Sequence, residues 1–244
     1  MLSWAAGYAR RVIRLLNWAV RYFPIRRVLR ANLASEELVL EVGSGSFGLG
    51  TFYPYPYVGC DVKFDVTPRK PMMPVRCSAT QLPFLEASFA AVVASDVLEH
   101  VPPEHRSAVV KETLRVARKV AIFGFPSGPE AHLLDERFHS ELKRRHTLCP
   151  DWLEEHLLYP FPERALFNDL GGAWLVETLG NDHLGFHDWV NKRELSRYWR
   201  ALFAILLSCV PGLLEFLLKF ADREPFYRMI FVVTRKSSEG IEAR

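Results

Sequence analysis

The sequence is poor in cysteine, and its cysteines form no motif. Cys60, Cys77, Cys149 and Cys209 lie far apart with no C-x-x-C pair, which excludes a zinc knuckle and a dithiol redox site of that kind. A reducing compartment is the simplest expectation for such a chain. From these cysteines we expect no metal ion.

The chain also lacks a strong net charge and an uninterrupted apolar run. A net charge of +3 over 244 residues does not predict nucleic-acid binding. Residues 201–220 are about as long as a membrane span, but Pro211 and Gly212 divide them, and Glu215 and Lys219 follow. We therefore expect a pair of short apolar helices at about 197–222.

Acidic residues are missing from the start of the chain, where residues 1–30 carry seven arginines. Apolar residues recur there at steps of three and four, which predicts an amphipathic helix over residues 3–23 that stops at Pro24. We assign residues 1–34 to a basic helical extension of a cytoplasmic protein. The helix packs on the following domain or lies peripherally on anionic lipid, and a mitochondrial presequence is a third interpretation.

A buried strand followed by a glycine loop opens the main domain. Leu38, Val39, Leu40 and Val42 are aliphatic without alternation, as in a strand covered on both faces. The spacing G-x-G-x-x-G at Gly43, Gly45 and Gly48 predicts a turn that brings a ligand against the main chain. Dinucleotide-binding domains begin in the same way, so an NAD(P)-binding oxidoreductase stays open.

The rest of residues 35–236 alternates strands and helices, which indicates an α/β fold. A second strand, Tyr57–Val62, carries Asp61 near its carboxyl end, where open parallel sheets bind ligands. A third predicted strand, Phe89–Ala94, leads into Ser95. The remaining elements that we predict are a helix at 103–117, strands at 119–126, 173–180 and 227–236, a mostly helical insert at about 127–172, and a flexible tail at 237–244.

Three segments resemble the class I S-adenosylmethionine-dependent methyltransferases. They are "LEVGSGSFG", "VGCD" and "ATQLPFLEASFAAVVASDVLEHV", and the last is similar to the small-molecule branch of that family. The resemblance implies a Rossmann-like sheet of seven mostly parallel strands, with helices on both faces and an antiparallel last strand. The sequence departs from the family at Ser78, where an aspartate is common.

The resemblance also implies S-adenosyl-L-methionine as the cofactor and assigns roles to individual residues. The loop of Gly43, Ser44 and Gly45 would take the amino-acid end of the cofactor, and Glu41 would orient this loop and reach the ammonium. Asp61 would bind the ribose and Val62 would lie against the adenine. The remaining expected contacts are the Ser95 carbonyl with the ammonium, and the adenine edge with Ser78, Ala79 and Thr80.

Histidines supply the candidates for acceptor chemistry. His100 follows the third predicted strand and is the best-placed general base, although it could instead only hold the next turn. His132, His139 and His146 are spaced by seven, so on a helix neighbours rise about 10.5 Å apart and cannot share one metal ion. His183, His187 and Asp188 could line a substrate mouth, and the insert could cover the substrate or form an extra packing layer.

The sequence therefore predicts a methyltransferase that acts on a small-molecule, glycan or lipid-linked acceptor, with no nucleic acid as partner. A different class of function stays open, namely a non-catalytic methyltransferase-like protein that binds a ligand or attaches to a membrane. The NAD(P)-binding oxidoreductase is the third alternative.

Overall fold

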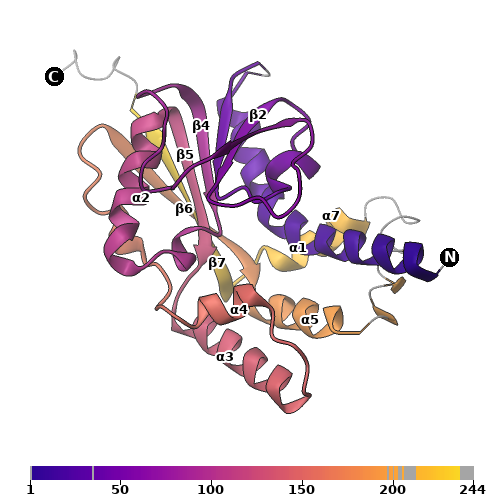
Figure 1. The fold of residues 1–244 in the computed structure, drawn as a ribbon. Helices are drawn as coiled ribbons and strands as arrows, with labels where there is room; N and C mark the ends of the chain where they lie inside the picture. The colour runs from indigo at the N-terminus through magenta and orange to yellow at the C-terminus, as the bar shows by residue number, and fades with distance from the viewer. Residues whose placement is uncertain are drawn as a thin grey trace.

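The chain folds around one seven-stranded sheet (Figure 1). The structure is a computed structural model that describes residues 2–34, 36–196, 198–199, 201–202, 205 and 213–236, with only the backbone described for residues 2–16, 51, 194, 214–215, 217 and 220. The strands are β1 (Val39–Val42), β2 (Tyr57–Asp61), β3 (Met72–Arg76), β4 (Phe89–Ser95), β5 (Ala117–Pro126), β6 (Trp174–His183) and β7 (Phe226–Arg235).

The sheet order is β3-β2-β1-β4-β5-β7-β6. Strands β1 to β5 pair in parallel, whereas β7 pairs antiparallel with both β5 and β6. The predicted fold, a mostly parallel seven-stranded sheet with an antiparallel last strand, is confirmed. Dinucleotide-binding domains have the order 3-2-1-4-5-6 without such an insertion, so this order argues against the NAD(P)-binding alternative.

Hydrophobic pattern explains why the central strands were predictable and one edge strand was not. Every residue of β1 and β4 is buried, in keeping with sequences that are apolar apart from Glu41 and Ser95. Strand β3 is mostly exposed and contains Pro74. A proline is tolerated at a sheet edge because its position needs no donor to a neighbouring strand, and β3 pairs only with β2.

Helices cover both faces of the sheet. Ile25 and Leu29 of α1 (Leu2–Asn32) pack against one face with the short helix η1 (Gly48–Thr51). Val109 and Leu114 of α2 (Pro103–Val116) pack against the other. The remaining described helices are η2 (Leu98–His100), α3 (Pro129–Arg144), α4 (Asp151–His156), η3 (Arg164–Phe167), α5 (Leu184–Glu194) and α7 (Leu213–Ala221).

Helix α1 does not stop at Pro24, so that expectation is wrong. A proline inside a helix leaves the carbonyl four residues earlier without its backbone donor. That carbonyl belongs to Val20, and the side chain of Asn181 on β6 donates a hydrogen bond of 3.1 Å to it, a normal length for this kind of bond. Asn181 thus replaces the missing N–H, and α1 continues through Asn32.

The predicted insert forms α3, α4 and η3. Figure 1 places α3 and α4 beside α5 at one end of the molecule, whereas Phe167 of η3 packs in the main core. His132 and His139 lie on α3, but His146 lies beyond its end with a φ of 50°. The three histidines therefore do not share one helical face. The insert packs through small apolar clusters of its own, one of them formed by Phe138, Leu142 and Leu153.

The predicted apolar helical pair is described only in part. Helix α7 falls within it, whereas residues 203–204 and 206–212 lie outside the described residues. Among the helices in the described ranges, none combines the length and the apolar character that crossing a membrane requires.

Candidate active site

A cavity of about 250 Å³ opens at the carboxyl ends of β1, β2 and β4. The chain order reverses between β1 and β4 in this sheet, and such a switch point is where open α/β sheets bind their ligands. Three groups of residues line the cavity: the loop after β1 (Gly43, Ser44, Gly45, Ser46, Phe47, Gly48), the ends of β2 and β4 (Asp61, Ser95, Asp96, His100), and the helices α1 and α4 (Trp18, Arg21, Tyr22, Trp152, His156).

The glycine loop has a backbone that side chains would disturb. Gly43, Gly45 and Gly48 have φ values of 70°, 52° and 45°, a region that L-residues rarely adopt. A Cβ on Gly43 would lie 2.3 Å from Cγ2 of Val97, whereas a Cβ on Gly45 would meet nothing within 4 Å. Gly43 therefore packs tightly against the start of η2, and Gly45 leaves room for a ligand.

Glu41 lies beneath this loop and is 1% exposed. Its carboxylate accepts hydrogen bonds from the Tyr22 hydroxyl (2.8 Å) and from the Leu49 N–H (2.7 Å). Burial raises the pKa of Glu41 to about 8, against the opposing effect of these two hydrogen bonds. The carboxyl group of Glu41 thus ties α1 and η1 to β1. Glu41 is not among the described residues that line the cavity.

Asp61 closes the opposite side of the loop. Its Oδ2 accepts a hydrogen bond from the Gly45 N–H (2.8 Å), and its Oδ1 accepts one from the Lys63 N–H (3.1 Å). A carboxylate oxygen has two lone pairs, so each oxygen can accept a further hydrogen bond from a ligand hydroxyl. Asp61 therefore shapes the loop and still offers acceptors to the cavity that it lines.

Two arginines converge on Asp96, directly after β4. Nη1 of Arg21 on α1 lies 2.6 Å from Oδ2 of Asp96, and Nη1 of Arg228 on β7 forms an ion pair with Oδ1. Arg228 is only 2% exposed, and burial lowers its pKa well below the ordinary value. Asp96 itself has a φ of 55°. Neighbouring Ser95 is buried at the cavity, and its Oγ has no hydrogen-bond partner among the described residues.

Two histidines form the wall nearest α4. Nδ1 of His100 lies 2.8 Å from Oε2 of Glu155, and the rings of His100 and His156 are 5.1 Å apart. Burial lowers the pKa of His100 to about 4. Nδ1 of His156 hydrogen-bonds Oδ2 of buried Asp135 (2.8 Å). The hydrogen bond to Asp135 fixes the ring of His156, whereas Nδ1 of His100 has Glu155 as a charged neighbour but no hydrogen-bond partner of suitable geometry among the described residues.

The structure brings together part of the predicted site. Gly43, Ser44, Gly45, Asp61, Ser95 and His100 all line the cavity. Val62 is 61% exposed, Ala79 packs partly against the core, and the hydroxyl oxygens of Ser78 and Thr80 lie 2.8 Å apart. These four are not among the cavity-lining residues that the structure describes, so their adenine contacts stay predictions.

Sequence reasoning missed the part of the wall that comes from outside the central strands. Trp18, Arg21 and Tyr22 lie on α1, which was predicted only as an extension, and Trp152 and His156 lie on α4 within the insert. Asp96 carried a signal, because it directly follows a buried strand at the sheet edge where ligands bind.

The expected substrate mouth at α5 does not lie at this cavity. Nδ1 of buried His187 hydrogen-bonds Oδ2 of Asp182 (2.7 Å). Nδ1 of His183 accepts hydrogen bonds from the backbone at the start of α5. Both histidines thus have structural contacts of their own.

Comparisons with known proteins agree with this fold. A sequence model of the methyltransferase domain family matches residues 40–125, while no curated protein matches the chain. The structure resembles the methyltransferase domain of bacterial CtHen1-CN, with a TM-score of 0.51 and 15% identity over 90% of this chain and 99% of that one. A chain in the complex of the Haloferax volcanii Trm112 methyltransferase activator with its methyltransferase has a TM-score of 0.51 and 12% identity over 96% and 98% of the two chains.

A third solved structure is magnesium protoporphyrin IX methyltransferase from Synechocystis PCC 6803 with bound SAH. It has a TM-score of 0.45 and 15% identity over 94% of this chain and 84% of that one. At their low sequence identities, the two structures with TM-scores of 0.51 support the fold alone.

The residues at the cavity fit S-adenosylmethionine, the cofactor of the methyltransferase family. This cofactor carries an ammonium and a sulfonium, which favour a carboxylate such as Asp61 beside them. It also has ribose hydroxyls, for which Asp61 has free lone pairs, and the space above Gly45 admits a ligand to the backbone. The match of residues 40–125 to the methyltransferase domain family, the sheet order and the glycine loop are together consistent with a class I S-adenosylmethionine-dependent methyltransferase.

Proposed function

We propose that this enzyme methylates a small-molecule, glycan or lipid-linked acceptor, which binds in the cavity on the side of α1 and α4. The observation that carries the proposal is that one cavity is lined both by the glycine loop with Asp61 and by aromatic and histidine side chains of α1, η2 and α4. When bound, S-adenosylmethionine supplies a methyl carbon activated by a positively charged sulfur. The protein has to hold and align the acceptor and exclude water.

On the cofactor side, Gly43, Ser44 and Gly45 hold the amino-acid end along the loop backbone, and the Ser95 carbonyl accepts from the ammonium. Asp61 binds the ribose hydroxyls. Val62 packs on the adenine, whose edge lies along Ser78, Ala79 and Thr80. Glu41 supports the loop from beneath through its bond to the Leu49 N–H.

On the acceptor side, Trp18 and Trp152 offer aromatic surface and Arg21 offers a positive charge. Aromatic walls with a few placed polar groups are typical of small-molecule sites. His100 is the candidate, by position, to take up a proton from the acceptor. The seven arginines in residues 1–30 support peripheral contact with anionic lipid, which would bring a lipid-linked acceptor to the cavity.

Calorimetry with S-adenosylmethionine and S-adenosylhomocysteine tests the cofactor site. Asp61→Asn keeps an oxygen for the Gly45 N–H but loses the charged acceptor for ribose, so we expect affinity to fall by roughly 10- to 100-fold. Asp65→Asn is the matched control, because Asp65 is an exposed neighbour whose side chain pairs only with Lys63 in the described contacts. Binding of NAD(P) without binding of S-adenosylmethionine would reject the proposal.

Flotation with anionic liposomes tests the lipid contact. Deleting residues 1–30 would remove Ile25 and Leu29 from the core, so the suitable variant replaces Arg10, Arg11 and Arg14 with Gln in the full chain. We expect the wild-type protein to float with the liposomes and the variant to stay in solution. Equal distributions of the two proteins would contradict membrane contact through this helix.

A further inference from the structure

Glu99 is a buried carboxylate without a hydrogen-bond partner. It lies in η2 directly before His100, is 1% exposed, and neither carboxylate oxygen has a partner among the described residues. Buried polar groups are nearly always paired, because leaving one unpaired costs free energy. A missing partner at this position points to an ion, a water or a proton between Glu99 and its neighbours.

His156 faces the carboxylate of Glu99 with Nε2, the ring nitrogen that is not hydrogen-bonded to Asp135. Nδ1 of His156 hydrogen-bonds Oδ2 of Asp135 (2.8 Å), and the Tyr227 hydroxyl donates to the same oxygen (2.9 Å). With its Nδ1–H donated to Asp135, His156 has its lone pair on Nε2, which lies 3.9 Å from Oε1 of Glu99. A carboxylate that fixes the far side of an imidazole is the usual support of a metal-binding histidine.

His100 supplies a third donor to the same point. One ligand atom from each of Glu99, His100 and His156 lies within 4.8 Å of the other two. Ligands at about 2 Å from a common ion are separated by roughly 3 to 4 Å, so small side-chain shifts would close the site. Both histidines line the cavity, which leaves the fourth side of the cluster open toward the acceptor.

We propose that Glu99, His100 and His156 bind one divalent transition-metal ion, such as Zn²⁺, with an open coordination position that faces the cavity. Two imidazoles and one carboxylate suit ions of this class. The expectation of no metal rested on the cysteines and on three other histidines, so it did not consider this cluster. Resting on the proposed function, the open position would hold an acceptor through an oxygen donor such as a hydroxyl or carboxylate. In the metal-bound protein His100 is a ligand of the ion and does not also take up the proton of the acceptor.

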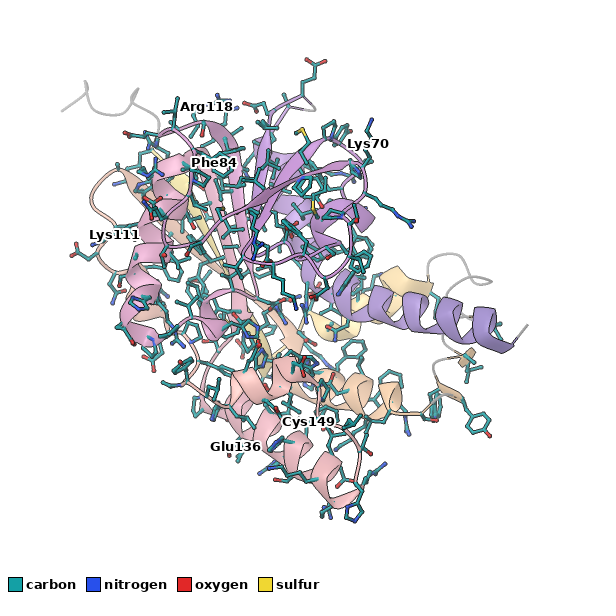
Figure 2. The ribbon with its side chains drawn as sticks, viewed as in Figure 1. Lys70, Phe84, Lys111, Arg118, Glu136 and Cys149 are labelled. Carbon is teal, nitrogen blue, oxygen red and sulfur yellow. The ribbon has the colours of Figure 1, made fainter. Side chains whose placement is uncertain are left out.

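A second cluster, His139, Cys149 and Glu154, also meets the distance criterion among the described residues. It is the weaker candidate, because Glu154 is exposed and Sγ of Cys149 contacts the Pro150 carbonyl (3.7 Å). It does not line the cavity. Cys149, labelled in Figure 2, precedes α4, and Glu154 lies on this helix together with His156 of the first cluster, so the two clusters need to be separated by experiment.

Titration of the full-length, chelator-treated protein with Co²⁺, followed by visible absorption and calorimetry, tests the site. We expect one equivalent to bind to the wild type, and affinity to fall at least about tenfold in Glu99→Gln and in His156→Gln. Cys149→Ser is the matched control and should bind like the wild type. Circular dichroism melting identifies any variant that fails to fold, and Zn²⁺ should raise the melting temperature of the wild type but not of the folded variants.

Absence of Co²⁺ binding by the folded wild type overturns the metal site, as does unchanged binding in both Glu99→Gln and His156→Gln. Loss of Co²⁺ binding in Cys149→Ser assigns the ion to the second cluster and thereby overturns the site proposed at Glu99, His100 and His156. S-adenosylmethionine binding, measured on the metal-free protein, is an independent readout. Metal binding without cofactor binding would contradict the proposed function and support the metal site. Cofactor binding without metal binding would support the proposed function and contradict the metal site.

Discussion

The buried carboxyl group of Glu41 should make the stability of the protein depend on pH, and Glu41→Gln should remove the part of that dependence that Glu41 contributes, while buried Glu99, whose pKa is also raised to about 8, keeps its own part. Burial raises the pKa of Glu41 from 4.5 to about 8 in the folded chain. Because the folded-state pKa is the higher one, the contribution to stability is fully present below pH 4.5 and is lost as the pH rises through about 8. Gln has nearly the same shape and offers the Leu49 N–H an oxygen without a charge.

The expected size follows from one proton taken up on folding. Between the two pKa values, the contribution of Glu41 to the free energy of unfolding falls by about 1.4 kcal/mol per pH unit. The contribution at about pH 7.5 is therefore about 3 kcal/mol smaller than at about pH 5.5. Urea unfolding at several pH values measures this slope in the wild type and in Glu41→Gln. Glu104→Gln, at an exposed position on α2, controls for the substitution. If Glu41→Gln loses stability with pH as steeply as the wild type, the assignment of the proton to Glu41 is wrong.

Three further changes test contacts around the cavity. Gly43→Ala places a Cβ 2.3 Å from Cγ2 of Val97 at a φ of 70°, so we expect the free energy of unfolding to fall by about 1 to 3 kcal/mol in thermal or urea melts. Asp96→Ala leaves the 2% exposed Arg228 without its ion pair, and a loss of about 3 to 5 kcal/mol is expected in the same assay. Tyr22→Phe removes the hydroxyl that donates a hydrogen bond to the carboxylate of Glu41. We expect the free energy of unfolding to fall by about 1 to 3 kcal/mol and the pKa of Glu41 to rise further. A variant as stable as the wild type would show that water replaces the hydroxyl.

Hydrophobic pattern predicted the centre of the sheet because its strands are buried on both faces. Strands β1 and β4 have no exposed residue, so their sequences contain no alternation that could be mistaken for another element. The predicted ends of β2 and β4 also placed Asp61 and Ser95 at the cavity. Strand β3 was not predicted, because an exposed edge strand with Pro74 lacks the apolar pattern.

The rest of the site depends on contacts between residues far apart in the sequence. The course of α1 past Pro24 depends on Asn181, which lies 161 residues from the carbonyl that it satisfies. Because the helix was expected to end there as an extension, its contributions to the cavity, Trp18 and Arg21, were not predicted. His156 was missed in the same way, since nothing in its local sequence indicates that it faces η2.

The amide of Asn181 has a consequence for the shape of the cavity. It supports α1 one helical turn before Pro24, and Trp18, Arg21 and Tyr22 all lie within three residues of the supported carbonyl. An edge strand on the far side of the sheet therefore sets the angle of one wall of the catalytic chamber without touching anything inside it. A substitution at Asn181 should therefore disturb this wall of the cavity, although Asn181 is not among the described residues that line it.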